Sequence, residues 1–156
     1  MKKSLLLTIL ISLVLLFIFG CAAQTKLADY QPKTADEKAV LDCMKEVNEA
    51  MATDDVSKTM ALYHDNAQIK IPKGTSKAPA MVSKQQFKTY LEEGGFKEMR
   101  LNIMEEVKVR EPVIVVTGDR ATIKGTSPAT NVTIRHQWDL VKEEDEWLII
   151  KADWWW

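Results

Sequence analysis

Alternating hydrophobicity in the last third of the chain constrains the fold most strongly. From Val132 to Leu140, the even positions carry Val, Ile, His, Trp and Leu, and the odd positions carry Thr, Arg, Gln and Asp. A period of two indicates a β-strand with one buried face, because successive side chains of a strand point to opposite sides of the sheet. This segment therefore predicts the central strand of a sheet that is covered on one side.

Similar segments surround it, separated by residues that favour turns. The strands are predicted at 99–109, 113–117, 121–126, 132–142 and 146–156, and the turns at Gly118-Asp119 and at residues 143–145. Short turns between consecutive strands favour antiparallel pairing. The second half of the chain is therefore predicted to form an antiparallel meander.

The first half has helical periodicity instead. Helices are predicted from Thr34 to residue 52, from residue 56 to His64 after a cap within residues 53–55, and from Ser83 to residue 93. Between the last two, a short strand at 68–71 that stops at Pro72 and a loop at 73–80 are predicted. Thr34 and Ser83 each precede a Glu or Gln by three residues, a capping-box pattern, and Gly94-Gly95 ends the third helix. His64 and Asp65 are interpreted as structural residues at a helix end. Helices followed by strands, without alternation, predict the α+β class.

The N-terminus resembles the signal sequence of bacterial lipoproteins. Lys2 and Lys3 precede an uncharged apolar run at 5–19, shorter than the roughly 20 residues that span a bilayer. The motif Ile18-Phe19-Gly20-Cys21 is similar to a lipobox. The resemblance implies that Cys21 is the first mature residue and carries a diacylglyceryl thioether and an N-acyl chain such as palmitate. An ordinary secretory signal or an uncleaved anchor is the alternative.

The domain boundaries follow from this resemblance. We expect a signal peptide at 1–20, a tether at 21–33 and one folded domain at 34–156, located at the cell envelope on a lipid anchor. In a diderm organism the anchor would lie in the outer membrane and face the periplasm, because Ala22 is not aspartate.

Charge and cysteine content exclude several functions. Without Lys2 and Lys3 the formal net charge falls from −1 to −3 and no basic stripe is present in the sequence, so nucleic acid is not an expected partner. Cys21 and Cys43 are the two cysteines, and lipidation of the first leaves no internal disulfide. Cys43 is interpreted as a core residue. With two histidines far apart in sequence, neither a metal site nor a cofactor is expected.

Several motifs together resemble the nuclear transport factor 2-like superfamily, which includes ketosteroid isomerase and scytalone dehydratase. They are Asp54-Asp55-Val56, residues 60–67 (MALYHDNA), residues 118–123 (GDRATI), residues 138–142 (WDLVK) and residues 146–150 (EWLII). The resemblance implies a cone, in which three N-terminal helices pack on a strongly curved antiparallel sheet and leave a ligand pocket. The expected lining residues of that pocket are Met44, Met51, Tyr63, Phe87, Tyr90, His136, Trp138 and Trp154.

The residues of isomerase chemistry are not found where the resemblance would place them. Ile71 occupies the position of the aspartate base, Val47 that of the tyrosine, and His136 that of the second acid. Isomerase chemistry of that type is therefore not expected.

His136 has two interpretations. It is either a core histidine bonded to Tyr63, Tyr90 or a backbone carbonyl, or a general base supported by Asp139 or Asp153. Asp139 has the opposite strand parity to His136, which argues against the second interpretation. The favoured function is a non-catalytic module that binds a small apolar ligand or a protein, and the alternative is a small lyase, isomerase or hydrolase that uses His136.

Two further surfaces predict partners. Alternation within Trp154-Trp155-Trp156 should leave at least one indole exposed, as a partner surface, a ligand lid or a contact with the membrane interface. The resemblance also implies a homodimer that pairs through the exposed sheet face.

Overall fold

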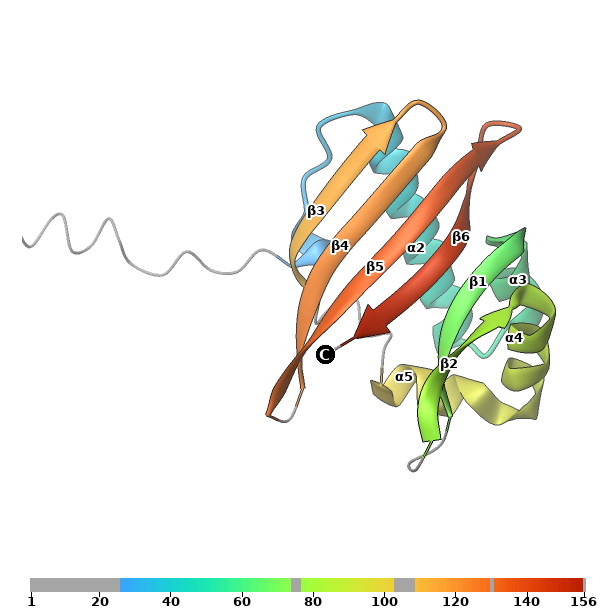
Figure 1. Cartoon of the computed structure of the whole chain (residues 1–156). Coiled ribbons are helices and arrows are strands. Elements are labelled where there is room, and N and C mark those ends of the chain that lie inside the picture. Colours follow the sequence, from blue (N-terminus) through green and yellow to red (C-terminus); the bar gives the residue numbers. More distant parts are fainter. Residues whose placement is uncertain (1–25, 74–76, 103–108, 130, 156) are drawn as a thin grey trace, which may run out of the picture.

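The computed structural model of the chain describes residues 26–73, 77–102, 109–129 and 131–155 (Figure 1). Its elements, in chain order, are η1 (Leu27–Asp29), α2 (Ala35–Ala52), α3 (Val56–Ala61), β1 (Tyr63–Lys73), β2 (Lys77–Ser83), α4 (Lys84–Tyr90), the π-helical turn η2 (Leu91–Gly95), α5 (Phe96–Asn102), β3 (Arg110–Thr117), β4 (Arg120–Ala129), β5 (Val132–Glu143) and β6 (Glu146–Trp155).

One curved sheet supports the whole domain. Its strand order is β2-β1-β6-β5-β4-β3, and β3 to β6 form the predicted antiparallel meander. The pairing of β1 with β6 is parallel, which the sequence did not indicate. In Figure 1 the long helix α2 lies across one face of the sheet, while the other face is turned to the viewer. The α+β prediction is confirmed. We call the helix-covered side the inner face and the opposite side the outer face.

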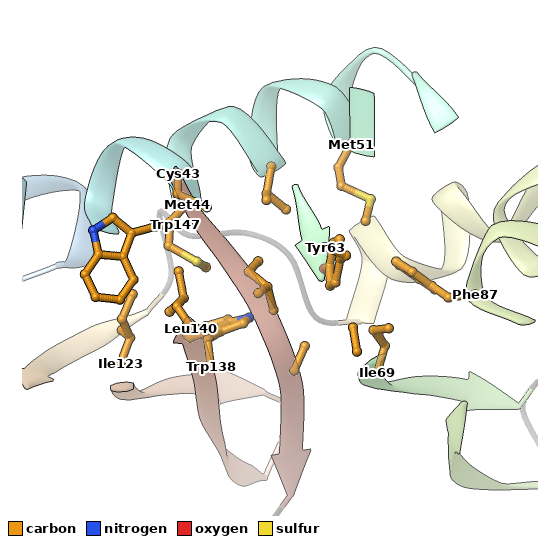
Figure 2. Packing of buried hydrophobic residues seen from close by; sticks show 14 of the residues in the cluster. Cys43, Met44, Met51, Tyr63, Ile69, Phe87, Ile123, Trp138, Leu140 and Trp147 are labelled. Carbon is orange, nitrogen blue, oxygen red and sulfur yellow. The ribbon is translucent and has the colours of Figure 1, made fainter. Parts of the chain in front are cut away.

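Apolar residues of α2 fill the space between the helix and the inner face. Val40, Met44, Val47 and Met51 recur at helical spacing and are at most 2 % exposed. They meet apolar side chains of the strands, among them Ile69, Ile123, Trp138, Leu140 and Trp147 (Figure 2). Apolar burial on this scale is the main favourable term in folding, so the position of the helix is set by this interface.

The predicted helix starts are confirmed by their caps. Thr34 Oγ1 accepts a hydrogen bond from Glu37 N, Asp55 Oδ1 accepts from Lys58 N, and Ser83 with Gln86 forms the complete capping box. The Glu37 carboxylate accepts from the backbone N–H of Lys33 rather than from that of the cap residue. Each cap supplies acceptors that the first turn of a helix lacks.

One predicted boundary between residues 83 and 109 is confirmed and one is wrong. Gly94, at φ +97°, is non-helical and ends the third helical run as predicted, but a further helix, α5, begins directly after it. The predicted strand at 99–109 starts inside α5, where Phe96 and Met99 are buried on one face. Residues 103–108 lie outside the described ranges. Helical spacing of these two apolar residues outweighed the strand-like composition that follows them.

Three predicted boundaries are also wrong around β1 and β2. The second helix ends at Ala61, so His64 and Asp65 lie in β1 and not at a helix end. The strand passes through Pro72, which was predicted to stop it. Residues 77–80, predicted as loop, belong to β2. β2 is an edge strand, and a proline such as Pro79 is tolerated there.

Part of the predicted tether packs on the domain. Lys26 forms a β-bridge with Arg110, Leu27 N donates to Val109 O at 2.9 Å, and the Leu27 side chain is buried. The chain before residue 34 is thus attached beside the start of β3.

Candidate functional site

His136 is a buried, ionisable group of the inner face. It lies on β5, is 2 % exposed, and its Nε2 is 2.7 Å from the Oγ of Ser127 on the neighbouring strand β4. The partner is therefore Ser127, and not Tyr63, Tyr90 or a backbone carbonyl as the sequence predicted. The signal for Ser127 was its alternation parity on β4, which places its side chain on the same face as Ile123.

Burial keeps this histidine neutral. The ring stacks on Trp138, with centroids 5.4 Å apart and planes inclined by 5°. Desolvation lowers the pKa of His136 to about 4. Its Nδ1 is buried and has no hydrogen-bond partner. The His136–Ser127 pair therefore leaves one polar atom, His136 Nδ1, unsatisfied among apolar side chains. That atom carries a desolvation cost unless a hydrogen-bond partner binds to it.

The two carboxylates considered as helpers lie on the outer face. Asp139 accepts hydrogen bonds from Thr122 Oγ1 and from Gln137 Nε2. Asp153 pairs with Lys70 at 3.0 Å and with Lys151 at 3.4 Å. Burial alone would raise the pKa of Asp153, but these two lysines hold it below its usual value. Neither carboxylate can orient or deprotonate an imidazole on the other side of the sheet.

The expected pocket residues are brought together on the inner face, where they pack against one another. Seven are buried and Tyr90 is half-buried: Met44, Met51, Tyr63, Phe87, Tyr90, His136, Trp138 and Trp154. Tyr63 and Phe87 meet edge to face at 5.4 Å, and Figure 2 shows them below Met51. Burial raises the pKa of the Tyr63 hydroxyl, whose oxygen has no hydrogen-bond partner. Two polar atoms thus remain unsatisfied in this cluster, on Tyr63 and on His136.

The positions aligned with isomerase residues are apolar and buried. Val47 is fully buried in α2, and Ile71 is 6 % exposed in β1. An aliphatic side chain can neither remove a proton nor donate a hydrogen bond to an oxyanion. The geometry therefore offers no acid–base pair of that kind at these positions.

His64 and Asp65 have structural contacts. His64 Nε2 is 3.0 Å from Glu143 Oε1, and its Nδ1 accepts from Asn66 N. Lys84 Nζ is 2.9 Å from Asp65 Oδ1 and 2.6 Å from Tyr63 O. The hydrogen bond to Lys84 holds the pKa of Asp65 below its usual value. These contacts tie the start of β1 to the end of β5 and to α4.

Two hollows were not foreseen from the sequence. The larger, about 660 Å³, lies on the outer face and is lined by Asn66, Gln68, Met81, Arg120, Ala121, Thr122, Asp139, Leu140, Ile150 and Lys151. The smaller, about 420 Å³, lies between α2, α3 and the β5–β6 turn, with Cys43 and Trp147 in its wall. The outer hollow follows a register shift between β5 and β6, where β6 contains one extra residue, Ile150. Such a bulge has no sequence signature here.

The structure shows no metal site in the ranges it describes. No group of three His, Cys, Asp or Glu side chains there could hold an ion. Cys43 is buried in the apolar core, as predicted. No helix among the described residues is long and apolar enough to span a bilayer. Cys21 and its lipobox lie outside the described residues.

Comparison with known proteins supports the fold alone. No family model and no curated protein sequence matches the chain. A solved NTF2-like protein from Cytophaga hutchinsonii is similar at 17 % identity and a TM-score of 0.55, over 78 % of this chain and 98 % of that one. An NTF2-like protein of unknown function from Pseudomonas putida is similar at 14 % and 0.54, over 80 % and 88 %. A protein of unknown function with a cystatin-like fold from Nostoc punctiforme is similar at 16 % and 0.50, over 79 % and 96 %. The fold is therefore the NTF2-like cone.

Proposed function

We propose that this chain is a lipid-anchored binding module: a non-catalytic NTF2-like domain held at the cell envelope through Cys21. The lipobox supports the anchor, because two or three acyl chains on one residue hold a protein on a membrane stably. In a diderm organism the domain would face the periplasm from the outer membrane.

The observation that carries the non-catalytic half is the isolation of His136. Ser127 is its hydrogen-bond partner, the nearest candidate carboxylates lie across the sheet, and the buried ring is neutral at pH 7. General acid–base catalysis needs a group whose pKa lies near the working pH and whose orientation is fixed by a partner. His136 has no suitable pKa, and the two carboxylates considered as its helpers, Asp139 and Asp153, lie on the opposite face.

The same residues favour binding of a molecule with one polar group on an apolar body. His136 Nδ1 would pair with that group, and the aromatic side chains of Trp138 and Trp154 would contact the remainder. A ligand that satisfies a buried orphan atom gains affinity, because the cost of that atom is already present in the empty protein. A small apolar or amphipathic ligand of the inner face is the first candidate.

The alternative is an enzyme that uses His136. The unpartnered Nδ1 is the observation that favours it, since a substrate could complete the site. The discriminating experiment incubates purified protein with a metabolite extract from the same cells and compares substrate and product masses between wild type and His136→Gln. We expect no conversion that depends on His136. A product formed by the wild type and not by the variant contradicts the proposal.

The anchor is tested separately. The N-terminal peptide of the protein extracted from membranes should begin at Cys21 and carry the mass of a diacylglyceryl group and an acyl chain. Cys21→Ser should prevent both the lipid addition and the cleavage that follows it. A mature N-terminus at any other residue would refute the anchor while leaving the binding proposal standing.

The homodimer remains a prediction. The outer hollow offers room for side chains of a second copy, and members of the fold implied by the resemblance often pair through this face. Sedimentation of the domain in the absence of membranes should show whether it is a dimer.

A further inference from the structure

The charges of the outer face are distributed in cross-strand rows that no single stretch of sequence reveals. Strand register places Arg110, Thr126, Arg135 and Trp155 in one row and Val113, Lys124, Gln137 and Asp153 in the next. We call these two rows the basic face. Each of the strands β3 to β6 contributes two of these residues and at most one cation, so the chain has no basic run although the sheet has a basic patch.

The cations of the basic face outnumber its carboxylates. Asp153 is the one carboxylate in the two rows, and it is already paired with Lys70 and Lys151. Lys124 and Arg135 are exposed and have no ion pair in the described part of the chain. Unpaired cations on a chain of net negative charge are complementary to an anionic surface.

Apolar side chains stand between these cations. Val113 is 57 % exposed and Trp155 is 37 % exposed, and the register places Trp155 beside Arg135. Tryptophan is favoured at the boundary between water and lipid, where an amphipathic ring meets both. The mixture of exposed cations, valine and indole suits a headgroup layer.

Acidic side chains gather at the opposite end of the sheet. Asp119 lies in the β3–β4 turn, and Glu143, Glu144 and Asp145 lie at the β5–β6 turn. The basic face lies near the end of the sheet where β4 passes into β5. Both turns lie at the other end (Figure 1). Arg120 pairs with Asp119 and Lys142 with Asp145 at this end, so its carboxylates are partly compensated but still outnumber its cations. We call the two ends of the strands the basic end and the acidic end for the sign of their excess charge.

The anchor emerges at the basic end. Lys26 is bridged to Arg110, which belongs to the first row of the basic face. Lys26 follows Cys21 by five positions, so the lipid is attached within about 17 Å of the bridge whatever path the chain takes. A domain held on so short a connection must touch the bilayer near this point.

From these three observations we propose that the basic face rests on anionic headgroups of the membrane to which Cys21 is anchored, with the acidic turns directed away from it. This orientation depends on the proposed anchor. It leaves the acidic turns, and the smaller hollow between α2, α3 and the β5–β6 turn, accessible to a partner. Two copies facing each other through this same patch would oppose cation to cation, which disfavours a dimer centred on these rows.

Lysine acylation with a water-soluble reagent tests the orientation in the full lipidated protein. The protein is inserted either into nanodiscs of phosphatidylcholine alone or into nanodiscs rich in phosphatidylglycerol. The labelled lysines are then located by mass spectrometry. Lys124 should react about fivefold more slowly on the anionic discs, because it contacts headgroups there. Lys38 and Lys45, on the far side of the sheet, serve as internal references and should react equally on both.

A matched pair of variants identifies the cause. Arg135→Glu should remove most of the protection of Lys124 on anionic discs, whereas Lys97→Glu, the same change of charge on α5, should leave it intact. High salt should also remove the protection, because exposed charges are screened. Equal reactivity of Lys124 on both discs overturns the inference. Protection of Lys124 in detergent that equals its protection on anionic discs overturns the inference as well, because a second copy of the protein would then cover the basic face.

Failure of the anchor is distinguishable from failure of the orientation. The mass of the N-terminal peptide from the same sample reports whether Cys21 carries lipid. If it does not, phosphatidylglycerol vesicles added to that protein still decide the inference, because Lys124 is then either protected by them or not.

Discussion

Burial of a neutral histidine makes the stability of this domain depend on pH in a way that can be calculated. His136 has an ordinary pKa of 6.5 in the unfolded chain and a pKa of about 4 in the folded protein, because its burial disfavours the charged ring. The unfolded chain therefore binds the proton more readily between these two values. Protons added in this window favour unfolding, so the free energy of unfolding falls as the pH falls from 6.5 toward 4.

The size of the effect follows from the same two values. Lowering the pH from 7 to 4.5 should remove about 2.5 kcal/mol of stability through His136 alone, and complete protonation about 3 kcal/mol. This is a large share of the roughly 5–15 kcal/mol that is typical of a domain. Carboxylates titrate near the same pH, so the wild type alone cannot isolate the histidine.

The assay compares variants by urea unfolding at pH 7 and at pH 4.5. His136→Gln should be less stable than wild type at pH 7, because Ser127 loses its partner, but it should lose about 2.5 kcal/mol less on acidification. His64→Gln is the matched control and should lose as much as wild type, because it leaves the buried His136–Ser127 pair intact. An equal loss for wild type and His136→Gln would refute the argument from burial.

Three further changes test the packing by urea unfolding. Leu140→Ala, at a 1 % exposed position on the inner face, should cost about 3 kcal/mol. Ser83→Ala, which removes the cap of α4, should cost about 1 kcal/mol. Gly125→Ala should destabilise the protein, because the added Cβ would collide with Val109 Cγ1. Adding Val109→Ala should restore part of the lost stability. If the stability losses of the two single variants simply add in the double variant, the contact is contradicted.

The sequence predicted the parts of the fold that depend on local pattern. Strict alternation identified β5, and capping residues identified the starts of α2, α3 and α4. The buried face of α2 was correct at Val40, Met44, Val47 and Met51 because helical spacing encodes it directly. Alternation also predicted that at least one indole of residues 154–156 is exposed, and Trp155 is exposed while Trp154 is buried; Trp156 lies outside the described residues.

The errors arose where tertiary structure overrides local preference. Pro72 is tolerated within β1, and α5 extends past residue 99, where a strand was predicted to begin. The parallel pairing of β1 with β6 joins residues far apart in sequence, so no window of sequence could reveal it.

The candidate site was predicted only in part, because strand parity can be read from the sequence but strand register cannot. The parity of β5 placed His136 inward and Asp139 outward, and both placements are confirmed. The partner Ser127 was missed because it depends on the register between β4 and β5. The basic face was missed because its charges come from different strands, so it became visible only when the strands were aligned.

Native mass spectrometry of the protein extracted from its own membrane tests the central claim, an anchored domain that binds without converting. The account predicts a lipidated chain beginning at Cys21 that carries one small apolar molecule, which is released at unchanged mass after prolonged incubation. A chain that begins elsewhere, or a bound molecule whose mass changes during incubation with wild type but not with His136→Gln, would contradict it.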